Sequence, residues 1–327
     1  MLRACEPQVI RKSLDRAAWH RPLISIVVTH FNYSEHIEDA LLSLLDQSYE
    51  NWECVLIDDA SEPAHRDRLK GILHTIGSDR IRLIEHRENL GQIPAFYTGL
   101  DATSGEFVCL LDPDDRYAGS FLEEALACHL NEAVYCPVVC TEQMLLAGSG
   151  LVTGIYSWRN RARMSPQGGA VLITPVKPQL LYHEPHKRGW HWTSTSAMMF
   201  RRAALRFLRP HKVLAYKGSF DSYMANGAHM LGGTLFFTKP LVYRGLHQAN
   251  AWITAGVYAS AQNKQKTYGE ERTAECIVDV TEAMLQNGAV LPKEPSPPSR
   301  YSLLTKWERS IKKRWRSLNR LLRLKNA

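Results

Sequence analysis

The sequence of 327 residues carries 40 Lys or Arg against 33 Asp or Glu, and 45% of its residues are hydrophobic. This length is sufficient for one large two-lobed unit with a substantial core. No apolar run approaches the roughly 20 residues that a membrane-spanning helix needs, and the first residues lack a hydrophobic signal core. We expect a cytoplasmic protein, with peripheral association at the cytoplasmic membrane face as a second option.

The formal net charge of +7 is concentrated near the C-terminus. Residues 306–325 include nine basic residues and one acid, which leaves 31 basic against 32 acidic residues in the rest of the chain. Because the remainder is nearly neutral, the high isoelectric point does not indicate that it binds nucleic acid. We expect no nucleic-acid partner.

After an N-terminal extension (residues 1–21), apolar runs typical of strands alternate with helix-length segments over residues 22–140. The strand-like runs are Leu23–Thr29, Cys54–Ile57, Ile81–Ile84 and Phe107–Leu111. Apolar residues recur at helical spacing at Ile37, Leu41, Leu44 and Leu45, and again at Leu69, Ile72, Leu73 and Ile76. The alternation predicts an α/β fold with a Rossmann-like, mostly parallel sheet and helices on both faces.

Polar residues follow three of these predicted strands. They are Thr29 to Asn32, Asp58 to Ser61, and Asp112 to Asp115. Because ligands of parallel sheets bind beyond the carboxyl ends of the strands, these distant segments are predicted to meet in one crevice.

The segment Asp112-Pro113-Asp114-Asp115 places three carboxylates at the end of one strand. Close carboxylates repel one another unless a cation lies among them. A hard divalent cation needs only one or two protein carboxylates when substrate phosphates supply other ligands, so the cluster indicates a metal-nucleotide site. The alternative is a turn whose aspartates cap a helix.

Five motifs in this order resemble the nucleotide-binding half of family 2 glycosyltransferases. They are Ile24–Asn32, Ser43–Tyr49, Leu56–Ser61, Asn89–Gly91 and Leu110–Asp115. The resemblance is close over residues 22–132 and thinner over residues 193–250. It implies a GT-A fold, a nucleotide-sugar donor, a divalent cation (Mn²⁺ or Mg²⁺) and transfer with inversion at the anomeric carbon.

The resemblance also implies roles for individual residues. The nucleotide would be bound by Thr29 and Phe31 at the base, by Asp59 as acceptor of a base N–H, by Asn89, and by Asp112 and Asp114 near the ribose. An acceptor such as Asp59 favours uracil or thymine. Asp115 is the preferred metal ligand.

The second half (residues 141–250) is expected to bind the acceptor and to supply the catalytic base. The family usually carries an acidic pair where this chain has Phe220-Asp221, so Asp221 is the candidate base, and a helix N-cap is the alternative. His247 lies in a segment resembling the one that closes over the diphosphate. It is a candidate metal or phosphate ligand, with a purely structural role as the alternative.

Two further features of this half bear on the site. The family commonly has an Arg-Asn pair after Asn89–Gly91, and this chain has Phe96 where the basic residue is expected. Trp190 and Trp192 could stack on a sugar ring of the acceptor, although Trp at such positions equally often packs in a core.

The C-terminal part divides into a helical segment (residues 251–288), a Pro-rich linker (residues 289–300) and a basic amphipathic helix (residues 301–327). The apolar positions of the last helix are Trp307, Ile311, Trp315, Leu318 and Leu322. Such a helix suits an anionic membrane surface. We favour this over packing of the helix on the catalytic domain or on a second subunit.

The sequence therefore predicts an inverting, metal-dependent glycosyltransferase that uses a UDP-linked sugar. The tail makes a lipid-linked glycan acceptor, as in cell-surface polysaccharide synthesis, the expected partner. An inactive nucleotide-sugar-binding or scaffold protein of the same fold is the main alternative. A nucleotidyltransferase ranks lower, because the first strand is not followed by a Gly-rich basic phosphate loop.

Overall fold

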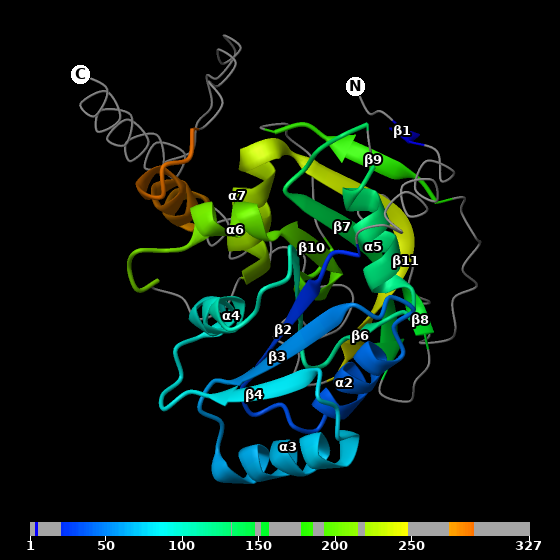
Figure 1. Cartoon of the computed structure of the whole chain (residues 1–327), viewed down its shortest axis with the longest axis vertical. Helices are drawn as coiled ribbons and strands as arrows, with labels where there is room; N and C mark the ends of the chain where they lie inside the picture. The colour runs from blue at the N-terminus through cyan, green and yellow to red at the C-terminus, as the bar shows by residue number, and fades with distance from the viewer. Residues whose placement is uncertain are drawn as a thin grey trace, which may run out of the picture.

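The computed structural model describes residues 4–5, 21–131, 133–147, 152–156, 178–185, 193–214, 220–247 and 275–290. In the first half, strands and helices alternate (Figure 1). They are β2 (Ile24–His30), α2 (Ile37–Leu45), β3 (Trp52–Asp58), α3 (Pro63–Ile76), β4 (Ile81–Glu85), α4 (Gln92–Asp101), β5 (Phe107–Leu111), β6 (Arg116–Tyr117) and α5 (Phe121–His129). The four predicted strands and both predicted helices are confirmed.

The second half extends the same sheet. Its elements are β7 (Val138–Ala147), β8 (Val152–Tyr156), β9 (Leu180–His183), the 3₁₀ turn η2 (Thr195–Ala197), β10 (Met198–Arg201), α6 (Arg202–Leu208), α7 (Phe220–Gly232), β11 (Thr234–Leu246) and a helix over residues 275–286. The strand order is β1-β9-β11-β7-β10-β5-β2-β3-β4, where β1 is Ala4–Cys5.

Strand directions differ between the two halves of the sheet. β5, β2, β3 and β4 are parallel, whereas β10 runs antiparallel between β5 and β7. β2 is buried along its whole length, as expected for a strand covered on both faces. The prediction of a largely parallel central sheet is confirmed, and the sheet is continuous from one half to the other.

Helices cover both faces of this sheet (Figure 1). On one face, α2, α3 and α5 pack their apolar residues on the strands, with Leu41 and Phe121 fully buried. On the other face lie α4, α6, α7 and the helix over residues 275–286, with Phe96 and Met284 fully buried. In the part of the chain that is described, no helix is long and apolar enough to cross a bilayer.

Arg202 holds the amino edge of the sheet together. Its guanidinium donates to the carbonyl oxygens of Leu100 (2.8 Å) and Gly105, and to the hydroxyls of Thr103 (2.8 Å) and Ser25 (3.0 Å). These bonds tie α6 to β2 and to the chain between α4 and β5. The opposite, carboxyl edge is the one where the candidate motifs lie.

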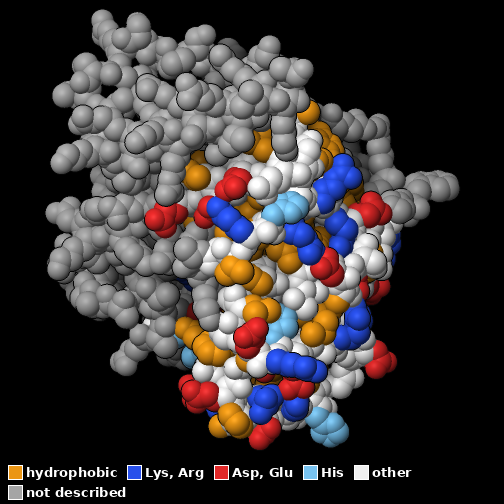
Figure 2. Space-filling model, turned by 90° about the vertical axis from the view of Figure 1, so that its left-hand side faces the viewer, with side chains coloured by type: hydrophobic (Ala, Val, Ile, Leu, Met, Phe, Trp, Pro, Cys, Tyr) orange, Lys and Arg blue, Asp and Glu red, His pale blue; other side chains and the backbone are white. Residues whose placement is uncertain are grey.

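The charge of the surface is mixed. On the face shown in Figure 2, Lys and Arg side chains are interspersed with Asp and Glu over the described residues. This agrees with the nearly neutral composition outside residues 306–325.

Gly99 allows α4 to pack closely on β2. A Cβ at residue 99 would lie 2.5 Å from Cγ1 of Val27, which is fully buried. Replacing Gly by Ala inside a helix usually stabilises it by about 1 kcal/mol, whereas overpacking a core costs about 1–3 kcal/mol. We predict that Gly99→Ala lowers the free energy of unfolding by about 1–2 kcal/mol in urea denaturation.

The exposed Gly71 of α3 provides the matched control, because a Cβ there would meet nothing within 4 Å. Gly71→Ala should therefore raise the free energy of unfolding by up to about 1 kcal/mol. Equal stabilisation by both substitutions would contradict the close α4–β2 contact.

Candidate active site

The carboxyl ends of three parallel strands bring the predicted motifs to one edge of the sheet. His30 of β2 pairs in register with Asp58 of β3, and Leu111 of β5 pairs with Val28 of β2. The segments that follow these strands therefore emerge side by side. Thr29 is 8% exposed and Phe31 is 45% exposed, so an aromatic ring is accessible at this edge.

A buried network joins the loop after β2 to the loop after β3. The Tyr33 N–H donates to Nε2 of His30 (3.2 Å), so Nδ1 carries the proton and donates to Oδ1 of Asp58 (2.8 Å). The hydroxyl of Ser61 also donates to Oδ1 of Asp58 (2.5 Å) and accepts from the Asn32 N–H (2.9 Å). Burial alone would raise the pKa of Asp58, but these hydrogen bonds outweigh it and hold the pKa below its ordinary value.

The same two loops contain strained backbone. Asn32 has φ of 57° and Ala60 has φ of 62°, both in the left-handed region. Asn32 is suited to this conformation, and its side chain accepts from the Glu62 N–H (2.8 Å). Ala60 has no such compensation and costs about 1 kcal/mol or more. The surrounding network therefore maintains a loop geometry that the chain would not otherwise prefer.

Asp59 fixes the loop that precedes α4. Its carboxylate accepts from Nδ1–H of His86 (2.7 Å) and from the N–H groups of Leu90 (3.0 Å) and Gly91 (2.7 Å). A carboxylate offers about four lone-pair sites, so acceptor capacity remains. The contact from Asp59 to a nucleobase stays a prediction, as does the role of the partly buried Asn89.

The start of α4 links Asp59 to the acidic cluster. Gly91 donates to Asp59, and the side-chain amide of the next residue, Gln92, donates to Oδ1 of Asp112 (2.8 Å). The start of α4 therefore connects the two acidic segments at the same edge of the sheet.

The three aspartates after β5 share one electrostatic environment. Asp115 is 2% exposed; its Oδ2 accepts from the hydroxyl of Ser196 (2.6 Å) and its Oδ1 from the Gly245 N–H (3.1 Å). Burial, followed by the charge of Asp114, raises the pKa of Asp115 to about 7.

The pKa of Asp112 is raised further and connects the candidate base to this cluster. Burial is the largest cause, followed by the charges of Asp115 and Asp114, and the charge of Asp221 contributes as well. Asp221, in the first turn of α7, therefore lies within electrostatic reach of Asp112. Arg244 of β11 opposes these effects at both Asp112 and Asp115.

β11 approaches the acidic loop so closely that only glycine fits at residue 245. A Cβ on Gly245 would lie 2.1 Å from the carbonyl oxygen of Asp114. Two residues later, Nε2 of His247 contacts Oδ2 of Asp114 at 3.0 Å. The structure thus places His247 beside the cluster, and its role as a metal or phosphate ligand stays a prediction.

Tyr33 and His36 cover His247 from the loop before α2. The His36 ring stacks on the His247 ring at 4.2 Å between centroids, and the Tyr33 ring lies 5.6 Å away, edge-on. Burial and the neighbouring His247 lower the pKa of His36, while burial, Asp114 and Asp112 raise that of Tyr33. Sequence reasoning missed both residues, and also Ser196, Gly245 and His86.

The acidic cluster fits a cation only if a ligand supplies further oxygens. Among the described residues, no group of three or more His, Cys, Asp and Glu side chains could hold a metal ion by itself. One or two carboxylates are enough when phosphates complete the coordination. Both oxygens of the preferred ligand Asp115 already accept hydrogen bonds, so Asp114, with 15% of its side chain exposed, is the more accessible carboxylate.

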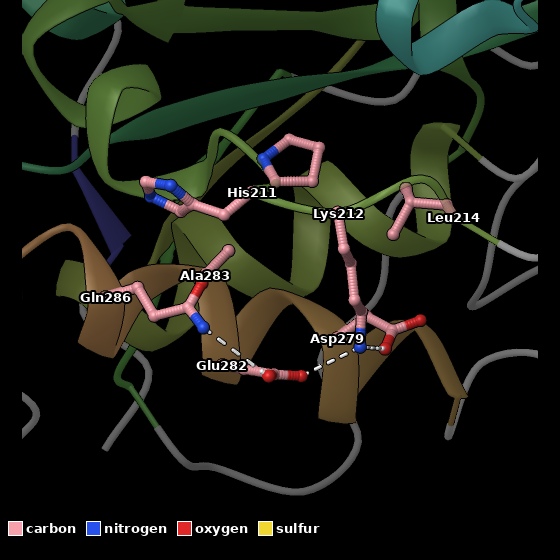
Figure 3. Close-up of a pocket in the computed structure, with 8 residues that line it drawn as sticks. His211, Lys212, Leu214, Asp279, Glu282, Ala283 and Gln286 are labelled. Atoms are coloured by element: carbon pink, nitrogen blue, oxygen red, sulfur yellow. Dashed lines mark hydrogen bonds and ion pairs between the residues drawn. The ribbon is translucent and has the colours of Figure 1, made fainter.

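A hollow between residues 210–214 and the helix over residues 275–286 lies away from these motifs (Figure 3). There Lys212 forms ion pairs with Asp279 (2.8 Å) and Glu282 (2.8 Å). These ion pairs join the segment after α6 to the helix over residues 275–286. Trp190 and Trp192 lie outside the described residues, as does the predicted helix over residues 301–327.

Comparisons with known proteins agree with this geometry. The family model described as "Glycosyl transferase family 2" matches residues 25–166. TuaG of Bacillus subtilis (strain 168), provisionally named a teichuronic acid biosynthesis glycosyltransferase, is 32% identical over 130 residues, which are 40% of this chain and 50% of TuaG. WfgD of Escherichia coli, a UDP-Glc:alpha-D-GlcNAc-diphosphoundecaprenol beta-1,3-glucosyltransferase, is 30% identical over 112 residues, 34% of this chain and 43% of WfgD.

Among solved structures, TarS of S. aureus (residues 1–349) in complex with UDP-GlcNAc aligns with a TM-score of 0.54 and 17% identity, covering 81% of this chain and 69% of that one. This similarity concerns the fold, and the two curated relatives are matched over half of their length or less. Sequence motifs, fold and family match agree: residues 25–166 match glycosyl transferase family 2, and the chain has a GT-A fold.

Proposed function

We propose that this protein is an inverting glycosyltransferase that moves a sugar from a UDP-linked donor to a glycan or lipid-linked glycan in cell-surface polysaccharide synthesis. The observation that carries the proposal is that the charge of Asp221 contributes to the raised pKa of Asp112. The candidate base from the second half therefore lies within electrostatic reach of the carboxylates of the proposed nucleotide-binding half. A single displacement requires the base, which acts on the acceptor, to lie next to the site that holds the donor.

Asp221 would accept the proton of the acceptor hydroxyl as that oxygen attacks the anomeric carbon, and the sugar bond to the diphosphate would break on the opposite side. Asp221 is partly exposed, so an acceptor can reach it. Its carboxylate accepts from its neighbour, the Ser222 N–H (2.7 Å), which keeps it near the start of α7.

The nucleotide would bind at the ends of β2 and β3. Phe31 offers an exposed ring for the base, Thr29 lies beside it in sequence, and Asp59 retains acceptor capacity for a base N–H. The names of the relatives support a UDP-linked donor, since WfgD uses UDP-Glc and TarS was solved with UDP-GlcNAc.

We propose Asp114, Asp115 and His247 as the side chains that hold a divalent cation, Mn²⁺ or Mg²⁺, together with the donor phosphates. Such an ion neutralises the charge that develops on the leaving diphosphate. Burial is the largest cause of the raised pKa values of Asp112 and Asp115, and the charges of neighbouring aspartates come next. This second contribution supports the assignment, because a bound cation would offset the repulsion.

An inactive scaffold of the same fold is the competing proposal, because Phe96 and Phe220 replace charged residues of the family pattern. Hydrolysis of a UDP-sugar in the presence of Mn²⁺ separates the two proposals, because an active enzyme would release free sugar. A scaffold would bind the nucleotide without hydrolysing the donor.

The tail over residues 301–327 is proposed to bring the enzyme to anionic lipid at the cytoplasmic membrane face. We predict that truncation after Pro292 abolishes binding to vesicles containing anionic phospholipid and lowers the rate on lipid-linked acceptor, while donor hydrolysis is unchanged. Vesicle flotation and both rates measure this. Undiminished flotation of the truncated chain would remove the proposal.

Asp115→Asn tests the donor site. The substitution removes a proposed metal ligand, so we predict that UDP with Mn²⁺ no longer raises the melting temperature. It also removes one of the repelling charges, so the metal-free protein should become more stable.

The pH dependence of stability tests the raised pKa of Asp115. Because this pKa is raised to about 7, the folded chain keeps a proton that the unfolded chain releases between about pH 4 and pH 7. The free energy of unfolding in EDTA should fall as pH rises through this window, less steeply in the variant.

Asp221→Asn tests the base. We predict a loss of about 10²–10⁴-fold in turnover, with the dissociation constant of UDP unchanged, because Asp221 is assigned to the acceptor hydroxyl. Kinetics and calorimetric titration measure the two effects. Asp101→Asn is the control, since Asp101 is 62% exposed and pairs with Arg209 at the end of α4. Wild-type turnover in the Asp221→Asn variant would show that another group is the base.

A further inference from the structure

A cluster of aromatic rings lies beneath the start of α7. Phe220 is the first residue of this helix, and Phe96 lies in the middle of α4; both are fully buried. Their ring centroids are 4.8 Å apart with planes at 65°, an edge-to-face contact. The ring of Phe200 on β10 is 6.4 Å from Phe220, at 88°. α7 is thus anchored at its first residue on both α4 and the sheet.

This contact joins two positions that the sequence analysis noted separately. Residue 96 is where a basic side chain was expected, and residue 220 is where the first acid of a pair was expected. The structure shows that the side chains at these positions touch. A single charge at either position would be buried against a benzene ring without a partner, which is strongly unfavourable. The two aromatic residues therefore stand together in place of the basic residue expected at position 96 and the acid expected at position 220.

The position of Phe220 matters because Asp221 follows it directly. Further along α7, the hydroxyl of Tyr223 donates to the carbonyl oxygen of Leu208 (2.9 Å). Gly227 packs so closely on Val280 that a Cβ there would lie 2.5 Å from Val280 Cγ2. These contacts hold the body of the helix, whereas the Phe96–Phe220 contact holds the turn that carries Asp221.

We propose that Phe220 and Phe96 are positioning residues for Asp221: their ring contact sets where its carboxylate lies relative to Asp112, and neither ring touches the donor. The inference rests on the proposed role of Asp221 as the base. In this proposal Phe96 helps to position Asp221, whereas a basic residue at position 96 would bind the diphosphate of the donor.

The test uses the full chain with Phe220→Leu, Phe96→Leu and the double variant. A displacement of the order of 1 Å at a reacting group can cost about 100-fold in rate, so we expect each single variant to lower the turnover of UDP-sugar hydrolysis roughly ten- to hundredfold. The dissociation constant of UDP with Mn²⁺ should stay within about twofold. The double variant should be no slower than the slower single one, because both remove the same contact.

Phe107→Leu is the matched control. It removes the same atoms from a ring that is 2% exposed at the amino end of β5, the edge opposite the site. Its turnover should stay within about twofold of the wild type. Should Phe220→Leu not fold, Phe96→Met serves in its place, since Met fills irregular core space but lacks a ring.

Three outcomes would overturn the inference. Turnover losses equal to that of Phe107→Leu would show that the rings only stabilise the fold. A weakened UDP complex with unchanged turnover would place residue 96 in the donor site. Wild-type turnover in Asp221→Asn would remove the base, and with it both the proposed function and this inference, whereas the first two outcomes leave the proposed function intact.

Discussion

Repulsion between buried carboxylates is the constraint on which the active site depends. Asp112 and Asp115 lie close to Asp114, and burial, followed by the charges of neighbouring aspartates, raises the pKa values of both. The protein offsets part of the cost with the Ser196 hydroxyl and the Gly245 N–H, which stabilise the charged form of Asp115. The repulsion among the aspartates that remains would be offset by the proposed divalent cation, which would bind together with the donor phosphates.

The groups that moderate this repulsion come from the far end of the chain. Ser196 lies 81 residues and Gly245 lies 130 residues from Asp115. They reach it because β10 and β11 belong to the same sheet as β5, and β7 runs without interruption across the boundary between residues 140 and 141. The first half of the chain therefore does not form its acidic cluster alone, and sheet pairing supplies the precision that the loops lack.

These separations also explain what the sequence could predict. Strands such as β5 are continuous apolar runs, and motifs at their ends converge by topology alone, so the meeting of Asp59, Asp112 and Asp115 at one edge of the sheet was foreseeable. The roles of Ser196, His86 and His36 were not, because each depends on a partner far away in sequence. Asp59 is an example of partial success: its place at the strand end was expected, but its three bonds to residues 86–91 were not.

The Phe96–Phe220 contact bears on where positive charge can meet the acidic cluster. With an aromatic residue at position 96, buried against Phe220, α4 presents no basic side chain at that position. Arg244, by contrast, lowers the pKa of both Asp112 and Asp115, so its charge acts on this cluster from β11. Gly245 brings this part of β11 against the backbone of Asp114, and His247 follows. The positive charge that reaches the acidic cluster therefore comes from β11, next to the Gly245 N–H that bonds Asp115, and not from position 96 in the middle of α4.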